Sequence, residues 1–463
     1  MNEPNDLIPK TDQASASHDI DTNLAEVILE AVHEEDAEHL TAIIAPLHPA
    51  DIAEFITTLA ADDRKAFIKL LGKQFNPEVL LELNTELREE AIESLGTQDS
   101  ATAITKLDTD DAVSIIEDLE KEDQQEILDV IPHDIRAELE EGLSYPEESA
   151  GRLMQKRFVA VPEYWTVGQV IDFLRSDNEE IPDDFYEIFV VDPKYHPIGT
   201  VLVSRIIRQQ RATIMREMMN TSLRIIDTKM DQEDVAYIFH KYGLASAPVV
   251  NDSGRLVGLL SIDDIVEIIE EEAEEDILHM GGVSETDINA SAFATAWRRF
   301  PWLVVNILTA ITVSFVIGIF EDTISSLVAL AILMPIVASI SGNTGTQAAT
   351  VAVRAIATKE LTSANALRII FKEVTVGALN GCVLAIFTGL TVWLRFHDIH
   401  LSLVFSGAMI FALIMGGFVG SLIPLGLVRV GVDPAIATGV FLTGVTDMVS
   451  FSSFLGLATL FLL

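Results

Sequence analysis

The sequence has one cysteine and far fewer basic than acidic residues. Cys382 lies within an apolar run, so no disulfide can form within the chain, as expected if its soluble part is cytoplasmic. The 30 Lys and Arg residues are outnumbered by 71 Asp and Glu residues, which gives a net charge of -41. Nucleic-acid binding requires a basic face, and the composition therefore excludes it.

The chain also lacks the common catalytic and secretory signals. It contains no Gly-x-x-x-x-Gly-Lys-Ser/Thr, His-Glu-x-x-His or Cys-x-x-Cys motif, and its ten histidines are scattered. We therefore predict that the protein is not an enzyme. The first 35 residues contain no basic segment followed by an apolar one, so we expect no signal peptide.

The negative charge is concentrated in the first two thirds of the chain. Residues 297–463 hold 8 basic and 7 acidic residues, whereas residues 1–296 hold 22 basic and 64 acidic residues. Such an acidic surface attracts cations, although most of its carboxylates are expected only to keep the surface soluble. A chain of 463 residues is also too long for one ordinary core, so several domains are expected.

The last third of the chain is predicted to cross a membrane five times. A spanning helix needs about 20 consecutive apolar residues. Five such runs occur, at Pro301–Phe320, Ile324–Val353, Val374–Leu394, Ile399–Val428 and Pro434–Leu463. An odd number places the termini on opposite sides. All Lys and Arg residues of this region except Arg395 fall on one side, which predicts a cytoplasmic N-terminus and an external C-terminus.

The second run carries polar residues at membrane depth. Asn343 and Gln347 lie within Ser339–Gln347, and polar groups are tolerated at this depth only against protein or water. Close packing through small residues, as expected for Gly416 and Gly420 in the fourth run, is one explanation. It does not account for the two amides, so we favour a water-lined path.

The fifth run contains an acidic residue. Asp447 lies near the hydroxyls of Thr443, Thr446 and Ser450 in the sequence, and no Lys or Arg lies inside any of the runs. A carboxylate at the bilayer centre costs about 2.5–3.5 kcal/mol on the insertion scale, so it is expected to face a cavity or a partner. We interpret Asp447 as a cation site, and a hydrogen bond to a neighbouring helix is the alternative.

The soluble part is predicted to begin with a helical domain. Apolar residues recur at spacings of three and four over residues 22–142. Asp51–Leu59 and Asp111–Leu119 resemble each other, and each is followed by an aspartate at the same distance, which indicates stacked helical pairs. We place this domain at residues 21–144, after a polar tail at residues 1–20 that we expect to be disordered.

A strand–helix–strand–strand–helix pattern then occurs twice. The first unit comprises Phe158–Val161, Val167–Arg175, Glu187–Val191 and Ile198–Val203, and the second comprises Leu223–Ile226, Asp231–Tyr242, Ala247–Val250 and Leu256–Leu260. The duplicated unit resembles a pair of CBS domains. Ile262–Met280 is predicted to follow as a helix with nine acidic residues, whose mutual repulsion a divalent cation would relieve.

With these features, the chain resembles the MgtE family of magnesium channels along nearly its whole length. The motifs that carry the resemblance are Tyr145–Met154, Ser341–Gln347, Gly431–Ala435 and Val445–Met448. The resemblance implies a multidomain α-helical membrane protein that forms a homodimer in the plasma (inner) membrane. After the helical N domain it would have tandem α/β CBS domains at 145–262, an acidic plug helix and linker at 263–296, and a five-helix transmembrane domain at 297–463.

The resemblance also implies a set of magnesium sites. Asp447 would be the pore carboxylate, and Asn343, Gln347, Thr443 and Thr446 would line the path beside it. Regulatory magnesium ions would bind at Asp110, Asp231, Asp264, Glu272, Glu275 and Asp276. Ser114 and Gly243 stand where the family pattern has acidic residues, and Gly439 where it has a polar one. We therefore expect a weaker or missing sensor ion and an altered pore contact.

The expected function is a channel that imports Mg2+ and is closed by cytoplasmic Mg2+ bound between the acidic N-domain, CBS and plug-helix surfaces. A Na+- or H+-coupled exchanger of divalent cations with the same architecture is the alternative. Ser261 and Asp264 also resemble the ribose contacts of CBS domains, which makes ATP a candidate ligand. The expected partners are the lipid bilayer, a second copy of the chain and divalent cations.

Overall fold

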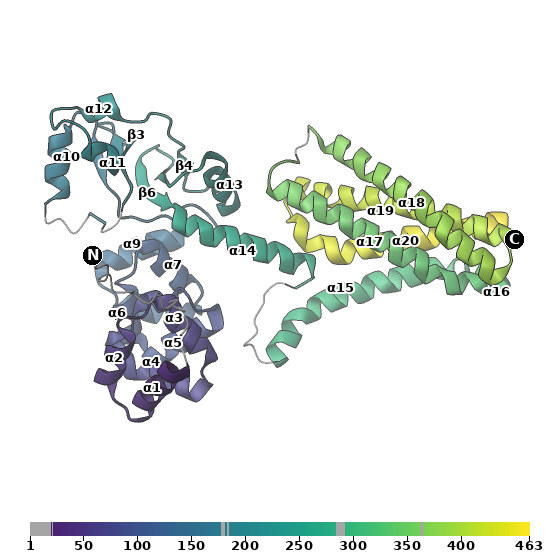
Figure 1. Cartoon of the computed structure of the whole chain (residues 1–463), viewed down its shortest axis with the longest axis horizontal. Coiled ribbons are helices and arrows are strands. Elements are labelled where there is room, and N and C mark those ends of the chain that lie inside the picture. Colours follow the sequence, from purple (N-terminus) through teal and green to yellow (C-terminus); the bar gives the residue numbers. More distant parts are fainter. Residues whose placement is uncertain (1–19, 21, 177–180, 183–184, 284–291, 362–363) are drawn as a thin grey trace, which may run out of the picture. The chain divides into compact units, whose positions relative to one another are not determined.

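The computed structural model describes residues 20, 22–176, 181–182, 185–283, 292–361 and 364–463 (Figure 1). The tail predicted at residues 1–20 lies outside the described residues, apart from Ile20. The chain divides into two compact units, residues 1–266 and 267–463. The boundary falls within helix α14 (Ile262–Met280), the acidic helix that the sequence predicts with the same limits.

The first unit begins with helices throughout, as predicted. They are α1 (Thr22–His33), α2 (Ala37–Ile44), α3 (Pro49–Thr58), α4 (Ala61–Leu71), α5 (Thr85–Leu95), α6 (Thr97–Ile104), α7 (Thr109–Glu117), α8 (Lys121–Val130) and α9 (His133–Ser144), with the short turns η1 (Gly72–Gln74) and η2 (Pro77–Leu80). The two similar segments form α3 and α7, which precede α4 and α8. The helices share one apolar core, in which Ile56, Phe67 and Ile116 are fully buried.

Two small sheets of the same design follow. The first has β1 (Ala160–Pro162), β2 (Glu187–Val191) and β3 (Pro197–Leu202), and the second has β4 (Ile226–Asp227), β5 (Ser246–Val250) and β6 (Leu256–Ser261). In each, the first pair of strands is parallel and the second pair is antiparallel. The register shifts at Val190/Val191 in one and at Val249/Val250 in the other. This equivalence confirms the predicted duplication.

The helices of these units are α10 (Val167–Leu174), α11 (Val203–Ile207), α12 (Met215–Met218) and α13 (Gln232–Tyr242). The first strand of each unit is shorter than predicted, because β1 begins at Ala160 instead of Phe158 and β4 at Ile226 instead of Leu223. An apolar pattern marks residues suited to a strand, whereas the ladder extends only where a partner strand runs alongside.

The second unit is a bundle of long helices. These are α15 (Ala292–Gly318), α17 (Ala329–Ala357), α18 (Ala366–Phe396), α19 (Ile399–Arg429) and α20 (Pro434–Phe461), with the short helix α16 (Glu321–Ser326) after α15. Among the described residues, five helices are long and apolar enough to cross a membrane. Figure 1 shows α17, α19 and α20 side by side, in agreement with their contacts. The prediction of five spans is confirmed.

The limits of the spans differ from those predicted. The second span begins at Ala329 instead of Ile324, because α16 occupies the intervening residues. The third helix begins at Ala366 and includes Arg368 and Lys372, which the prediction placed before the span. An absence of charge marks the segment within the hydrocarbon, and a helix continues beyond it wherever its backbone hydrogen bonds continue.

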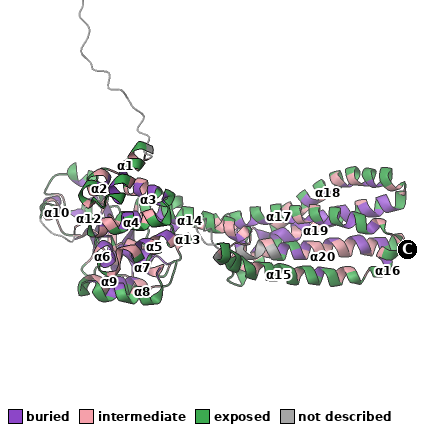
Figure 2. Cartoon of the chain, turned by 90° about the horizontal axis from the view of Figure 1, so that it is seen from below, coloured by how far each residue is buried: buried purple, intermediate pink, exposed green. Residues whose placement is uncertain are grey.

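The spanning helices are buried to very different degrees. In the most apolar 18-residue segment of each helix, 56% of the residues are buried in α19 and 6% in α15. In Figure 2, exposed residues dominate α15 and buried ones recur along α19. The bundle is therefore built around α19, whose Phe405 packs edge-on against Phe454 of α20.

Small residues bring α17 and α19 into close contact, as the spacing of Gly416 and Gly420 predicts. A Cβ atom added at Gly416 would lie 2.8 Å from the carbonyl oxygen of Ser341, and one added at Gly420 would lie 2.3 Å from that of Gly345. The hydroxyl of Ser341 is buried in the same contact and donates to the carbonyl oxygen of Ala412 at 2.9 Å. Small side chains at these positions allow the two backbones to approach each other.

We predict that Gly420→Ala destabilises the bundle, because its Cβ meets backbone that cannot move aside cheaply. Overpacking of this kind costs about 1–3 kcal/mol. Gly426→Ala is the matched control in the same helix, since a Cβ there meets nothing within 4 Å. Thermal unfolding of the full chain in detergent measures the difference. Equal midpoints for the two variants would contradict the close packing.

Candidate functional site

Asp447 lies on a face of α20 that the bundle leaves partly open. Positions around Thr446 contact α17, and Gly444 contacts Thr309 of α15. At 100° per residue, Thr443 and Asp447 fall between these two contact sides. Thr443 is exposed and Asp447 is half-buried. Within the described part of the chain, Asp447 has no hydrogen bond or ion pair to another side chain.

The predicted polar positions of α17 form an exposed stripe. Asn343, Gln347, Thr350 and Arg354 follow one another at intervals of three or four residues, and all four are exposed. The threonine hydroxyl donates to its own helix, at Thr346. The amides of Asn343 and Gln347 have no hydrogen-bond partner among the described residues. This face therefore requires cover from water or from another protein surface if it lies in a membrane.

Thr446 differs from the other predicted pore-lining residues. It is 1% exposed, and its hydroxyl donates to carbonyl oxygens of its own helix, at Leu442 and Thr443. Its methyl group packs where a Cβ at Gly345 of α17 would lie, 3.1 Å away. In this single chain, Thr446 joins two helices and does not face open space.

In the first unit, Asp110 is a buried carboxylate at the start of α7. It is 8% exposed, and its Oδ1 atom is buried without a hydrogen-bond partner among the described residues. Burial is the main reason why the pKa of Asp110 is raised well above its ordinary value of 3.8. The carboxylates of Asp264, Asp111 and Asp108 raise this pKa further. The fold therefore brings the predicted sensor residues Asp110 and Asp264 close together.

Asp264 is held by hydrogen bonds from two directions. Its Oδ2 atom accepts hydrogen bonds from the hydroxyl of Ser261 and from Nε2 of Gln155, the latter at 3.1 Å. The two predicted nucleotide contacts, Ser261 and Asp264, are thus in direct contact.

Asp231 stabilises the start of a helix in this chain. It caps the N-terminus of α13 by accepting from the backbone N–H of Glu233 at 3.0 Å, and it is exposed. Gly243 ends the same helix with φ +61°, a left-handed conformation that favours glycine. The absence of an acidic residue at 243 therefore has a backbone reason. Ser114 is exposed on α7.

In the last turns of α14, Asp276 lies close to a carboxylate of α20, that of Asp433. Partial burial raises the pKa of Asp276, and the nearby carboxylates of Asp433 and Glu275 raise it further. Glu272 lies one turn before Asp276, on the same side of the helix. Asp433 was not predicted as a site residue. The signal available was its place as N-cap before Pro434, in a region with only seven acidic residues.

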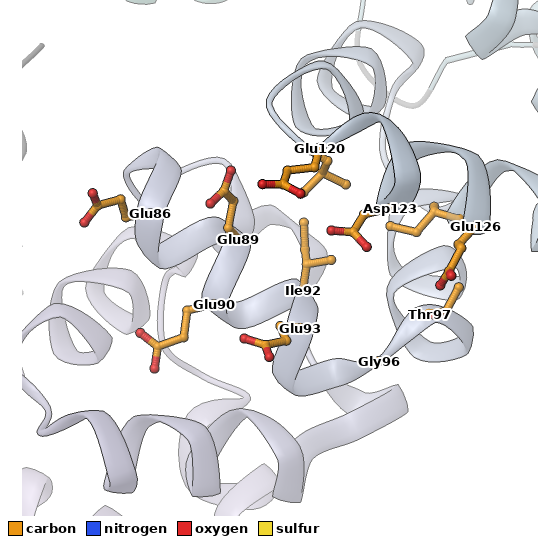
Figure 3. Close-up of a pocket in the computed structure, with 12 residues that line it drawn as sticks. Glu86, Glu89, Glu90, Ile92, Glu93, Gly96, Thr97, Glu120, Asp123 and Glu126 are labelled. Atoms are coloured by element: carbon orange, nitrogen blue, oxygen red, sulfur yellow. The ribbon is translucent and has the colours of Figure 1, made fainter. Parts of the chain in front are cut away.

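A second feature that was not predicted is an acidic cleft in the helical domain. It has a volume of about 500 Å3 and lies between α5 and α8. Seven carboxylates line it, from Glu86, Glu89, Glu90, Glu93, Glu120, Asp123 and Glu126. Figure 3 shows the glutamates of α5 on one side of it and Glu120, Asp123 and Glu126 on the other. Glu90 is paired with Arg64 at 2.7 Å.

No group of three His, Cys, Asp or Glu side chains in the described ranges is arranged to hold a bare metal ion. Magnesium loses its water reluctantly and usually keeps several water ligands, with one or two carboxylates completing the shell. The pairs Asp110–Asp264 and Asp276–Asp433 fit such a hydrated ion by their chemistry.

Comparisons with known proteins match all three parts of the chain. The family models that match are the divalent cation transporter MgtE at residues 334–457, the MgtE intracellular N domain at 47–148 and the CBS domain at 215–271. A magnesium transporter MgtE from Thermus thermophilus is 33% identical over 96% of this chain and 99% of its own length. One from Bacillus subtilis is 31% identical over 69% of this chain and 71% of its own length.

Among solved structures, the chain is similar to the cytosolic domain of the Mg2+ channel MgtE in complex with ATP. The identity is 32%, the match covers 53% of this chain and 99% of that one, and the TM-score is 0.49. The relatives are named as transporters and not as enzymes. The helical N domain, the CBS pair and the five membrane helices together establish that this chain belongs to the MgtE family of magnesium transporters.

Proposed function

We propose that this protein is a channel that imports Mg2+ and that cytoplasmic Mg2+ closes it. The observation that carries the channel is Asp447, a carboxylate at membrane depth with no cationic partner among the described residues. An unpaired charge in a membrane is retained where it has a function. A carboxylate that receives a still-hydrated ion fits the chemistry of magnesium.

The exposed stripe on α17 supports a homodimer with the path between its two copies. Asn343 and Gln347 have no hydrogen-bond partner among the described residues, and lipid supplies none. A second copy, together with the water that fills a path, would supply them. Asn343, Gln347, Thr443 and Asp447 would then face the ion. Thr446 would support this face by fastening α20 to α17.

The proposed sensor uses the repulsion between buried carboxylates. Without magnesium, the ionised side chains of Asp110 and Asp264 oppose each other across the contact between the helical domain and α14. A bound divalent ion would reverse this repulsion and favour the compact arrangement. Because the ion binds one arrangement better, it shifts the population toward it. Glu272, Glu275 and Asp276 of the plug helix would form a second such group with Asp433, the N-cap of α20.

The proposed orientation places the first unit in the cytoplasm and the C-terminus outside, in the plasma membrane. The basic residues at the ends of the spanning helices support it, since Arg298, Arg299, Arg354, Lys359 and Arg429 belong to the side that carries the first unit. A cytoplasmic sensor is then exposed to the ion concentration that the channel controls.

Nucleotide binding is a second candidate property. The observation that favours it is the contact between Ser261 and Asp264, which presents a hydroxyl and a carboxylate at the end of β6. We expect ATP to bind the full chain in detergent and Asp264→Ala to weaken that binding about tenfold, or 1.4 kcal/mol. Calorimetry measures this directly. If titration of the wild-type protein with ATP released or absorbed no heat, nucleotide binding would be contradicted.

We predict that Asp447→Asn lowers the magnesium current of single channels in planar bilayers at least about tenfold, because the site loses its charge. Asp322→Asn is the isosteric control, since Asp322 is exposed at the start of α16, outside the spanning helices. The wild-type current is expected to follow the magnesium gradient alone. Transport that instead reverses with an imposed sodium or proton gradient would favour the exchanger.

Asp110→Asn is expected to stabilise α7 in the absence of magnesium and to abolish the further stabilisation of α7 by added magnesium. In magnesium-free buffer, loss of the buried charge should slow hydrogen exchange of the buried amides of α7. Added magnesium should slow exchange in the wild type by about tenfold, or 1.4 kcal/mol, and leave the variant unchanged. Asp62→Asn is the matched control, because Asp62 takes the same second position in α4 and is exposed. A variant that still responds to magnesium would contradict the sensor role of Asp110.

The raised pKa of Asp110 also predicts a pH dependence. A carboxyl group whose folded-state pKa is above its unfolded value contributes stability that is fully present below the unfolded pKa of 3.8. This contribution is lost as the pH rises through the folded pKa. In magnesium-free buffer, the opening free energy of α7 should therefore fall as the pH rises from about 4 toward neutrality, and Asp110→Asn should flatten the profile. Exchange rates corrected for intrinsic chemistry measure it, and identical profiles would contradict the assignment.

A further inference from the structure

The end of the plug helix is fastened to the pore helix by a buried histidine. His279, in the last turn of α14, is 8% exposed. Its Nδ1 atom lies 3.0 Å from Oδ2 of Asp433, the residue that caps α20. Since a carboxylate only accepts, Nδ1 carries the proton in this hydrogen bond. The contact joins residues 154 positions apart in the sequence.

Asp433 uses its other oxygen for α20 itself. Its Oδ1 atom accepts from the backbone N–H of Ala435 at 2.8 Å, which satisfies a first-turn donor of the helix. One carboxylate thus connects the imidazole of His279 directly to the backbone of α20. The last turn of α14 is thereby connected to the helix that carries Asp447, 14 residues further on.

A second, independent contact lies beside the first. A Cβ atom added at Gly439 of α20 would lie 2.9 Å from the carbonyl oxygen of Met280. The close approach of the last α14 carbonyl to α20 therefore requires glycine at this position. This gives a physical reason for Gly439, which stands where the family pattern has a polar residue. The missing side chain makes room for the plug helix.

The end of α14 is itself well defined. The backbone N–H groups of Gly281, Gly282 and Val283 bond back to carbonyl oxygens of the last helical turn, and Gly282 has φ +70°. Such a C-terminal motif fixes the direction in which the helix ends. His279 also lies 3.5 Å from Oε1 of Glu275, one turn earlier on the same helix. Its ring is therefore held from its own helix and from α20.

We propose that His279 is a positioning residue of the gate and that, with Gly439, it couples the plug helix to the pore helix. This inference rests on the proposed closure by cytoplasmic magnesium and goes beyond it by naming the joint that transmits the closure. Magnesium bound to the sensor carboxylates moves α14, and the contacts of His279 with Asp433 and of Met280 with Gly439 carry α20 with it.

Three substitutions test the joint by current recording on the full-length protein. His279→Leu removes the hydrogen bond and keeps an apolar body, His279→Asn keeps an N–H close to the position of Nδ1, and Gly439→Ala pushes the Met280 carbonyl away. We expect His279→Leu and Gly439→Ala to raise the half-closing concentration of internal magnesium at least about tenfold, and His279→Leu to leave the single-channel conductance unchanged. His279→Asn should return it to within about threefold of the wild type. Gly426→Ala, at an open position of α19, should have no effect.

Hydrogen exchange in detergent separates failure of the joint from failure of the proposed function. His279→Leu should accelerate exchange of the amides at residues 281–283 and of Ala435, and His279→Asn should not. Normal closure in both His279→Leu and Gly439→Ala would overturn the proposal. Unchanged exchange in His279→Leu would also overturn it. A wild-type current indifferent to internal magnesium would refute the proposed gate, and the exchange data would still decide whether His279 fastens the two helices.

Discussion

Negative charge that the chain itself does not neutralise is the constraint on which both halves of this structure depend. In the first unit, Asp110 is buried beside other carboxylates, and one of its oxygens has no hydrogen-bond partner among the described residues. In the membrane half, Asp447 has no basic side chain near it in the described part of the bundle. Burying a carboxylate without a partner is costly, and a cation is the simplest compensation. The same chemistry thus suits a site for the transported ion and a site for the ion that regulates transport.

The packing of the bundle decides which sides of its helices stay open. Close packing through Gly416 and Gly420 uses the inner side of α17 to hold α19, which leaves the amide-bearing side of α17 exposed. On α20, Thr446 and Gly444 are used for packing, so that Thr443 and Asp447 remain on the open side. The helices are therefore divided into a packing side and a polar side. A single copy leaves the polar side without cover, which is why the proposed channel needs two copies.

Much of the fold could be predicted from local patterns. The apolar periodicity gave the helices of the first 144 residues, the repeated strand pattern gave two equivalent sheets, and the five apolar runs gave the spanning helices. The limits were less accurate where tertiary context decides, as at β1 and at the start of α17. For the candidate site, the family resemblance pointed to Asp110 and Asp264 as candidates, and the unpaired charge in an apolar run pointed to Asp447. Their grouping was not predicted, because it depends on which surfaces pack.

The residues that the sequence did not reveal are those whose role exists only in three dimensions. In the sequence, Asp433 is an ordinary N-cap candidate and His279 is one of ten scattered histidines. The fold places Nδ1 of His279 3.0 Å from Oδ2 of Asp433. Gly439 looks like a lost polar contact until the carbonyl of Met280 is found against it. The acidic cleft between α5 and α8 also combines residues that lie about 30 positions apart. Contacts of this kind have no periodic signature in one sequence.

The central claim is that one ion is both cargo and signal. The most direct test is the magnesium current of an inside-out patch while magnesium on the cytoplasmic face is stepped from zero to several millimolar. The account predicts that unitary current is present at zero internal magnesium and that channel openings disappear as the concentration rises, with no change in the amplitude of the remaining openings beyond that set by the gradient. Openings that persist at the highest internal magnesium would contradict it.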